Sequence, residues 1–224
     1  MIAVIVIMLR SLYHKRMVTE NNPMHKLYQN THFLTGSTSL KSMPPDTGRE
    51  VAFAGRSNAG KSSALNQICH QKSLARTSKT PGRTQQINFF TVAEERYLVD
   101  LPGYGYAKIA KSQQQKWGSL LQKYLLERDS LTGLVILMDI RHPLTSLDNQ
   151  LLVLCQTAKV PVHILLTKAD KLKRGAAKEA LRKVTQQLDE YENISVQLFS
   201  SLTGEGIHTA QTQLDDWLGF ETEQ

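Results

Sequence analysis

Cysteine is scarce in this chain: two residues among 224, Cys69 and Cys155, lie far apart in the sequence. Two thiols are too few for a disulfide framework and do not have the spacing of a metal site. We therefore expect two buried, reduced thiols in a cytoplasmic protein. The chain also has no internal repeat and no low-complexity segment. One compact domain is expected, because the motifs described below span the chain too evenly for a division into two.

Long hydrophobic runs are lacking as well. The apolar head Met1–Leu9 has nine residues, less than half of what a membrane span requires. It has neither the preceding positive charge nor the cleavage site of a signal peptide. An over-extended start is the favoured interpretation, with Met17 and Met24 as alternative starts, and a membrane-touching head is the other. Either way, no stable membrane insertion is expected.

Acidic residues are fewer than basic ones, 20 against 27, which gives a formal net charge of +7. Such an excess suits a polyanionic partner such as RNA, although ordinary solvated helix faces also explain it. Nothing indicates DNA, and a monomer is the default expectation. The cations gather in three groups: Lys72, Arg76, Lys79 and Arg83; Lys108, Lys111, Lys116 and Lys123; and Lys171, Lys173, Arg174, Lys178, Arg182 and Lys183.

A phosphate-binding loop is the clearest motif in the sequence. It matches G-x-x-x-x-G-K-[ST] and comprises Gly55, Arg56, Ser57, Asn58, Ala59, Gly60, Lys61 and Ser62. An apolar strand precedes it and a plausible helix follows, so backbone N–H groups and a helix N-terminus would surround phosphate oxygens. Lys61 would reach the β- and γ-phosphates, and the Ser62 hydroxyl would ligate Mg²⁺. The alternative is a glycine turn beside a surface lysine.

A D-x-x-G motif ends a second apolar run. It comprises Asp100, Leu101, Pro102 and Gly103. This places a carboxylate at the carboxyl end of a strand, where ligands bind in open α/β sheets. Asp100 would hold Mg²⁺ through a water, and the Gly103 N–H would approach the γ-phosphate. D-x-x-G alone is a common turn, but it follows the phosphate loop here.

A third strand end predicts the base. It carries Thr167, Lys168, Ala169 and Asp170. Guanine offers two adjacent donors that one carboxylate accepts, whereas adenine would leave Asp170 unpaired. Lys168 would lay its stem along the base and point its ammonium toward the phosphate loop. The alternative for Asp170 is a helix N-cap.

Two further segments complete the predicted site. Phe199, Ser200 and Ser201 follow another strand, and their N–H groups would approach guanine O6. Between the first two motifs, Pro81-Gly82 marks a loop that is a candidate switch. In that loop Thr84 would offer its hydroxyl to Mg²⁺, with Thr77, Thr80 and Thr91 as chemical rivals. GTP with Mg²⁺ is therefore the predicted ligand, and a nucleotide kinase or ATPase is the alternative.

Together these motifs resemble the EngB (YihA/YsxC) family of bacterial GTPases, over roughly residues 30–218. The family-specific pieces are K-T-P-G-R-T-Q and D-L-P-G-Y-G-Y-A. The resemblance implies GTP hydrolysis, a role in large ribosomal subunit assembly with its rRNA, and a need for the protein in division and septation. It also implies that Gly82, Arg83, Thr84, Gln85 and Gln86 line the nucleotide, and that Ser62 and Thr84 ligate the metal.

Tyr104 follows the D-x-x-G motif where a Ras-type GTPase carries the glutamine that orients the attacking water. We therefore expect slow intrinsic turnover, completed by a partner or an ion. Asn58 resembles the asparagine that binds K⁺ in some GTPases, which would make it catalytic alongside Lys61 and Thr84. The equal alternative is that Asn58 merely shapes the loop.

The expected fold is an α/β P-loop NTPase, a Ras-like G domain. A mainly parallel six-stranded sheet would carry helices on both faces, because near-continuous Val/Ile/Leu runs indicate strands buried on both sides. A hairpin over residues 87–100 would supply one antiparallel edge strand. Helices are predicted over Ser112–Arg128, Ser146–Ala158 (capped by Ser146), Ala176–Tyr191 and Ile207–Leu218. Residues 1–48 are expected as an N-terminal extension, 49–219 as the GTP-binding domain and 220–224 as a tail; within the extension, residues 10–48 read as an extended or mobile arm.

Overall fold

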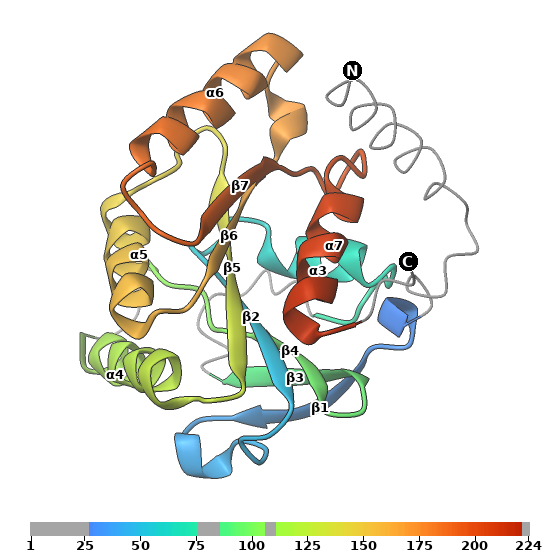
Figure 1. The fold of residues 1–224 in the computed structure, drawn as a ribbon, viewed down its shortest axis with the longest axis vertical. Helices are drawn as coiled ribbons and strands as arrows, with labels where there is room; N and C mark the ends of the chain where they lie inside the picture. The colour runs from blue at the N-terminus through green and yellow to red at the C-terminus, as the bar shows by residue number, and fades with distance from the viewer. Residues whose placement is uncertain (1–26, 76–85, 106–110, 221–224) are drawn as a thin grey trace, which may run out of the picture.

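A single sheet with the strand order β1-β3-β4-β2-β5-β6-β7 organises the computed structural model, which describes residues 27–75, 86–105 and 111–220 (Figure 1). β2 is parallel to β4 and β5, and β6 is parallel to β5 and β7. The strands are β1 (His32–Ser37), β2 (Arg49–Gly55), β3 (Ile87–Ala93), β4 (Arg96–Asp100), β5 (Leu131–Asp139), β6 (Val162–Thr167) and β7 (Ile194–Leu198).

Helices cover both faces of the sheet, as Figure 1 shows. The core therefore has two layers: α3 and α7 pack on one face, and α4, α5 and α6 pack on the other. The helices are α3 (Lys61–Ile68), α4 (Lys111–Glu127), α5 (Ser146–Ala158), α6 (Arg174–Gln187) and α7 (Ile207–Leu218), with short 3₁₀ turns η1 (Leu40–Ser42) and η2 (Ala169–Lys171).

The central strands are apolar because neighbouring side chains enter opposite layers. In β2, Ala52 and Ala54 belong to the layer under α4 to α6, while Val51 and Phe53 belong to the layer under α3 and α7. All four are at most 1% exposed. This double burial confirms the prediction of a mainly parallel sheet between helices.

Within the described residues the sheet already has seven strands, so the predicted number of six is wrong. The extra strand, β1, comes from the segment expected to be an extended or mobile arm, and it pairs antiparallel with β3. The antiparallel direction of β3 is confirmed by its pairing with β4, but β3 is not the edge strand, because β1 covers it. Phe33 and Leu34 of β1 are exposed, so the strand lacks the apolar alternation that marks a buried one.

The predicted helices are all present among the described residues, with bounds that differ by up to four residues. The N-cap of α5 is Thr145, so the predicted cap, Ser146, is wrong. The Thr145 N–H and hydroxyl both donate to Asp148, at 2.8 and 2.7 Å. Thr145 can form this capping box because Asp148 stands three residues beyond it.

Both cysteines are buried free thiols, as expected. Within the described residues, no helix combines the length and the apolar character that crossing a membrane requires. The apolar head Met1–Leu9 lies outside the described residues.

The carboxyl ends of the parallel strands meet at one edge of the sheet. Gly55 ends β2, Asp100 ends β4, Asp139 ends β5 and Thr167 ends β6. Because ligands bind beyond this edge in open α/β sheets, it is the expected place for a functional site.

The opposite edge carries a buried ionic cluster around Glu50, which is fully buried. The Tyr124 hydroxyl donates to the Glu50 carboxylate at 2.9 Å, and the Arg128 guanidinium donates to it at 3.0 Å. Arg128 also donates to the Pro44 carbonyl at 3.0 Å. The cluster thus fastens the end of α4 and the segment before β2 to the sheet, far from the predicted site.

Tyr28 and Asp215 form a second buried contact, between the N-terminal segment and α7. The Tyr28 hydroxyl donates to Asp215 at 2.7 Å, and burial raises the Asp215 pKa to about 6. Ionised Asp215 therefore costs the folded state free energy. Protonated Asp215 contributes its full stabilisation of the folded state below the pKa that the group has in the unfolded chain. This stabilisation is lost as the pH rises through about 6.

Asp215→Asn should stabilise the protein at pH 8, because asparagine still accepts the Tyr28 hydrogen bond without an ionisation cost. We expect the free energy of unfolding to rise by about 1–2 kcal/mol after allowance for solvent screening. Urea unfolding at pH 8 and pH 4 measures this. The difference should vanish at pH 4, and an equal difference at both pH values would contradict the assignment.

Candidate functional site

The phosphate loop connects β2 to α3 in a conformation that its residues favour. Gly60 is the N-cap of α3 and has φ +96°, a value that side chains with a Cβ rarely adopt. Asn58 has φ +66°, which asparagine tolerates better than most residues. The first turn of α3 therefore begins directly at Lys61 and Ser62, where the N–H groups of a helix N-terminus lack intrahelical partners.

Lys61 and Asp100 form an ion pair across the end of the sheet. Each side chain is 12% exposed, so the pair lies in a sheltered position at the carboxyl ends of β2 and β4. Ser62 follows directly on α3. A hydroxyl and a carboxylate are oxygen donors that suit a hard cation such as Mg²⁺, so the residues fit the predicted metal.

The segment after Asp100 runs beside the phosphate loop. Leu101 N–H donates to the Phe53 carbonyl at 3.0 Å, and Tyr104 N–H donates to the Gly55 carbonyl at 3.2 Å. Ser57 N–H returns a bond to the Tyr104 carbonyl at 3.0 Å. These backbone bonds hold the D-x-x-G turn and the phosphate loop together.

The Tyr104 side chain points away from this turn, toward the start of α5. Its hydroxyl donates to Asp148 at 2.8 Å, and burial raises the Tyr104 pKa well above its ordinary value. The hydroxyl is therefore protonated and engaged in a hydrogen bond at neutral pH.

The end of β6 is bound to the phosphate loop through two side chains. The Thr167 hydroxyl donates to the Ala59 carbonyl at 2.6 Å. The Lys168 ammonium group donates to the Asn58 carbonyl at 2.8 Å, the direction expected of it, and pairs with Asp139 at 3.0 Å. Hydrogen bonds from Arg141 hold the pKa of Asp139 well below its usual range.

Asp170 lies within the turn η2 and is not a helix N-cap, since α6 begins after Lys173. The Ser200 hydroxyl donates to Asp170 at 2.6 Å, and this bond lowers the Asp170 pKa. Lys171 pairs with the second carboxylate oxygen at 3.4 Å. Asp170 is therefore ionised at neutral pH and fixed in orientation.

The loop after β7 is built around buried Phe199 and Ser200. The Phe199 N–H donates to the Leu166 carbonyl at 3.0 Å, and the Ser200 N–H donates to the Glu205 carbonyl at 3.0 Å. The neighbouring Ser201 N–H has no acceptor within the described part of the chain. Of the N–H groups expected to approach a base, Ser201 is thus the one that remains available.

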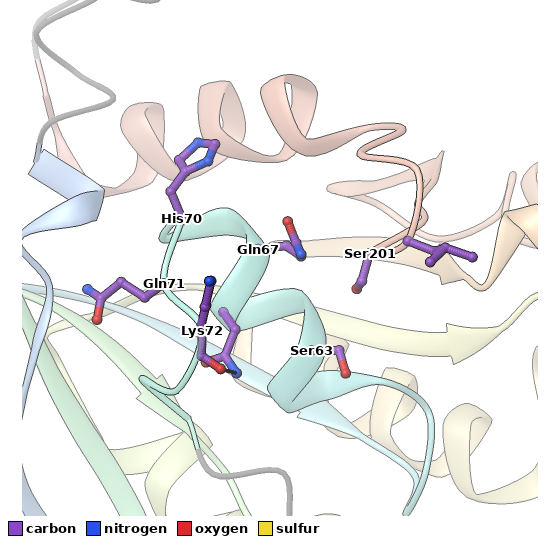
Figure 2. Close-up of a pocket in the computed structure, with 8 residues that line it drawn as sticks. Ser63, Gln67, His70, Gln71, Lys72 and Ser201 are labelled. Atoms are coloured by element: carbon purple, nitrogen blue, oxygen red, sulfur yellow. Dashed lines mark hydrogen bonds between the residues drawn. The ribbon is translucent and has the colours of Figure 1, made fainter.

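A groove of about 640 Å³ runs along the open side of α3 next to Ser201 (Figure 2). Ser63, Gln67 and Lys72 line it on the α3 side. Of the residues predicted for the site, the groove includes only Ser201, so it adjoins the site and does not coincide with it.

Part of the predicted site falls outside this arrangement. Gly82, Arg83, Thr84 and Gln85 lie outside the described residues, as do the rivals Thr77 and Thr80. Gln86 is described, and its side chain lies against Gly36 in the edge strand β1. The pairing of Asn88 with Asp100 places the start of β3, and Gln86 just before it, at the edge of the sheet that carries Asp100.

Two residues near the site hold contacts that the sequence did not predict. Asp139, which pairs with Lys168, directly follows an apolar run and had the same signal as Asp100. Asn66 is buried in α3, donates to the Ala75 carbonyl at 3.1 Å and accepts from the Ala75 N–H at 2.7 Å. It fixes the segment that leads toward the predicted switch, and no sequence pattern marks it.

The fold and the arrangement of these motifs define a P-loop GTPase domain. The family model of the 50S ribosome-binding GTPases matches residues 50–168. The chain is 53% identical over 191 residues to a probable GTP-binding protein EngB of Vibrio parahaemolyticus, which covers 85% of this chain and 87% of that relative. It is 53% identical over 198 residues to the Nitrosococcus oceani protein of the same name, covering 88% and 99%. The chain therefore belongs to the EngB family of GTP-binding proteins.

Solved structures agree on the fold. A crystal structure of a probable GTP-binding protein EngB aligns with TM-score 0.62 at 18% identity, covering 77% of this chain and 100% of that one. Era in complex with MgGDPNP and nucleotides of 16S ribosomal RNA aligns with TM-score 0.59 at 20% identity, covering 79% and 58%. At this identity the likeness concerns the fold alone.

Proposed function

We propose that this protein binds GTP with Mg²⁺, hydrolyses GTP to GDP and phosphate, and acts as a nucleotide-dependent switch. The observation that carries the proposal is the connection between Asp170 and the phosphate loop. Asp170 is oriented by Ser200, and two residues earlier Lys168 is bound to the Asn58 carbonyl. The protein thus holds the Asp170 carboxylate at a fixed distance from the phosphate-binding loop. This arrangement suits a single guanine nucleotide, with its base at Asp170 and its phosphates at the loop.

The phosphate end of the ligand would meet Lys61 and the start of α3. Ser62 and Asp100 would hold Mg²⁺, Asp100 through a water, and Thr84 would add its hydroxyl from the switch. The bound ion would neutralise charge that develops on the phosphates. Lys61 would bind the β- and γ-phosphates, and the N–H groups of residues 55–62 would surround their oxygens.

Slow intrinsic turnover is part of the proposal, because the Tyr104 hydroxyl is committed to Asp148. A hydroxyl held there does not orient an attacking water in the way that the Ras glutamine does. An additional cation or a partner would then complete the site.

For the partner we propose the large ribosomal subunit precursor and its rRNA, with the protein acting in the cytoplasm and needed for normal division and septation. The matched family is described as ribosome-binding, and Era carries ribosomal RNA in its solved complex. The third basic group supports a polyanionic partner. Its cations lie exposed along the segment from η2 to α6, and Glu179 is the one acidic residue of α6. They are Lys171, Lys173, Arg174, Lys178, Arg182 and Lys183.

Asp170→Asn should transfer preference from guanine to xanthine nucleotides. The amide loses the acceptor for the guanine 2-amino group but donates to the oxygen that xanthine carries there. We expect GDP affinity to fall about 100-fold, because one charge-assisted hydrogen bond is lost and the other becomes a weaker neutral one, and we expect affinity for xanthosine diphosphate (XDP) to rise. Competition against a fluorescent GDP analogue measures both.

Lys61→Ala serves as the companion variant, because it should lower the affinity for every nucleotide alike. It therefore separates phosphate binding from recognition of the base. In the same assay the wild-type protein should prefer GDP and GTP to ADP and ATP. A preference for ATP would end the proposal and favour a kinase or ATPase.

Turnover should depend on K⁺ if the Asn58 side chain, which is exposed beside the phosphate site, binds that ion. We expect GTP hydrolysis in KCl to exceed that in NaCl by about tenfold or more, up to the roughly 10³–10⁵ that an arginine finger supplies. Phosphate release at equal ionic strength measures the ratio.

Asn58→Gly separates the two roles considered for this residue, because glycine keeps the positive φ and removes the amide. The K⁺ effect should disappear in this variant while GDP binding persists. Equal wild-type rates in the two salts would leave loop shape as the role of Asn58.

The basic face of α6 should contribute to ribosome binding. Arg174→Gln with Lys178→Gln should weaken binding to purified large ribosomal subunits and reduce the slope of log affinity against log salt by about two. Sedimentation with a non-hydrolysable GTP analogue at several salt concentrations measures this. Lys41→Gln with Lys159→Gln removes the same charge from exposed positions elsewhere, and an equal loss in that control would contradict a role for α6.

A further inference from the structure

A buried hydrogen-bond chain connects β6 with the loop after β7. One ring nitrogen of His163, Nε2, lies 2.8 Å from Gln197 Oε1. Gln197 Nε2 donates to the Gly206 carbonyl at 2.7 Å and to the Leu198 carbonyl at 3.1 Å. His163 is 4% exposed and Gln197 is 8% exposed, so the chain lies inside the layer under α7.

The direction of each bond follows from the bond before it. Because the Gln197 amide group donates to two carbonyls, its oxygen must face His163 and accept. His163 Nε2 therefore carries the proton. Nδ1 then accepts from the Ser195 hydroxyl, which lies 2.6 Å away. Burial lowers the His163 pKa, in accord with this neutral form.

The far end of the chain is the closing point of the loop that carries Ser200 and Ser201. Gly206 is the N-cap of α7 and has φ +81°. A Cβ there would come within 2.5 Å of Gln197 Nε2 and 2.2 Å of the Leu198 carbonyl oxygen, so the two segments are in close contact. Glu205 directly precedes Gly206, and its carbonyl accepts a hydrogen bond from the Ser200 N–H. Fixing Gly206 therefore also restricts the position of Ser200.

From this geometry we propose that Gln197 is a positioning residue for guanine recognition. It fixes the closing end of the loop, so that Ser200 holds Asp170 and the Ser201 N–H faces the base. His163 in turn fixes the amide orientation of Gln197. The proposal rests on the proposed function, since it concerns the same base site, but Gln197 itself does not touch the nucleotide.

Gln197→Met tests the proposal, because methionine keeps the volume and removes both the donor and the acceptor. We expect the dissociation constant for a fluorescent GDP analogue to rise about tenfold, the equivalent of about one hydrogen bond between the protein and the base. Gln197→Glu keeps the acceptor for His163 but directs a carboxylate at two carbonyl oxygens, and it should weaken binding at least as much.

A double-mutant cycle with Ser200→Ala distinguishes positioning from general destabilisation. If Gln197 acts through this loop, Gln197→Met should cost much less than tenfold once Ser200→Ala has already released Asp170. Tyr124→Phe is the control, because it removes a buried hydrogen bond at the opposite edge of the sheet. It should lower the melting temperature without changing GDP affinity.

Three results would overturn the inference: unchanged GDP affinity in Gln197→Met, a full tenfold loss that persists in the Ser200→Ala background, or an equal loss in Tyr124→Phe. In each case the wild-type protein binds GDP and the proposed function stands. Wild-type protein that does not bind the analogue would instead overturn the proposed function, and this inference with it.

Discussion

The hydrogen bonds between the end of β6 and the phosphate loop are the constraint on which the rest of the site depends. Thr167 and Lys168 donate to consecutive carbonyls of the loop, those of Ala59 and Asn58, at 2.6 and 2.8 Å. Asp170 stands two residues further along the same segment. The spacing between the carboxylate proposed to read the base and the phosphate loop is thus set by the protein itself, which would reduce the ordering cost of nucleotide binding.

The carboxyl edge of the sheet is held in place by the two halves of the hydrophobic core, which lie away from the site. Residues of β2, β5 and β6 alternate between the two halves of the core, so these strands have little freedom to shift in register. The segment before β2 and the end of α4 are held at the opposite edge through Glu50. The site can therefore consist of short loops while its framework stays rigid.

The sequence predicted the parts of this protein that depend on local patterns. Strands buried on both faces have continuous apolar runs, and the phosphate loop needs Gly60 for its positive φ. Both features leave a local pattern in the sequence, so the strands and the loop could be predicted. β1 was missed because its Phe33 and Leu34 are exposed. The Ser200–Asp170 and Lys168–Asp139 contacts join residues about 30 positions apart, and no local pattern encodes them.

The charges at the carboxyl edge suit the proposed metal–triphosphate ligand in a specific way. Asp139 pairs with Arg141 and Lys168, so that carboxylate is neutralised by the protein itself. Lys61 and Asp100 pair with each other. With magnesium and a triphosphate bound, the Lys61 ammonium would turn to the phosphates and the Asp100 carboxylate to the metal's water. Each charge would exchange one partner for another, and neither would be left buried alone, a state that costs several kcal/mol. On the proposed function, the ion pair would compensate both charges between ligands without opposing ligand binding.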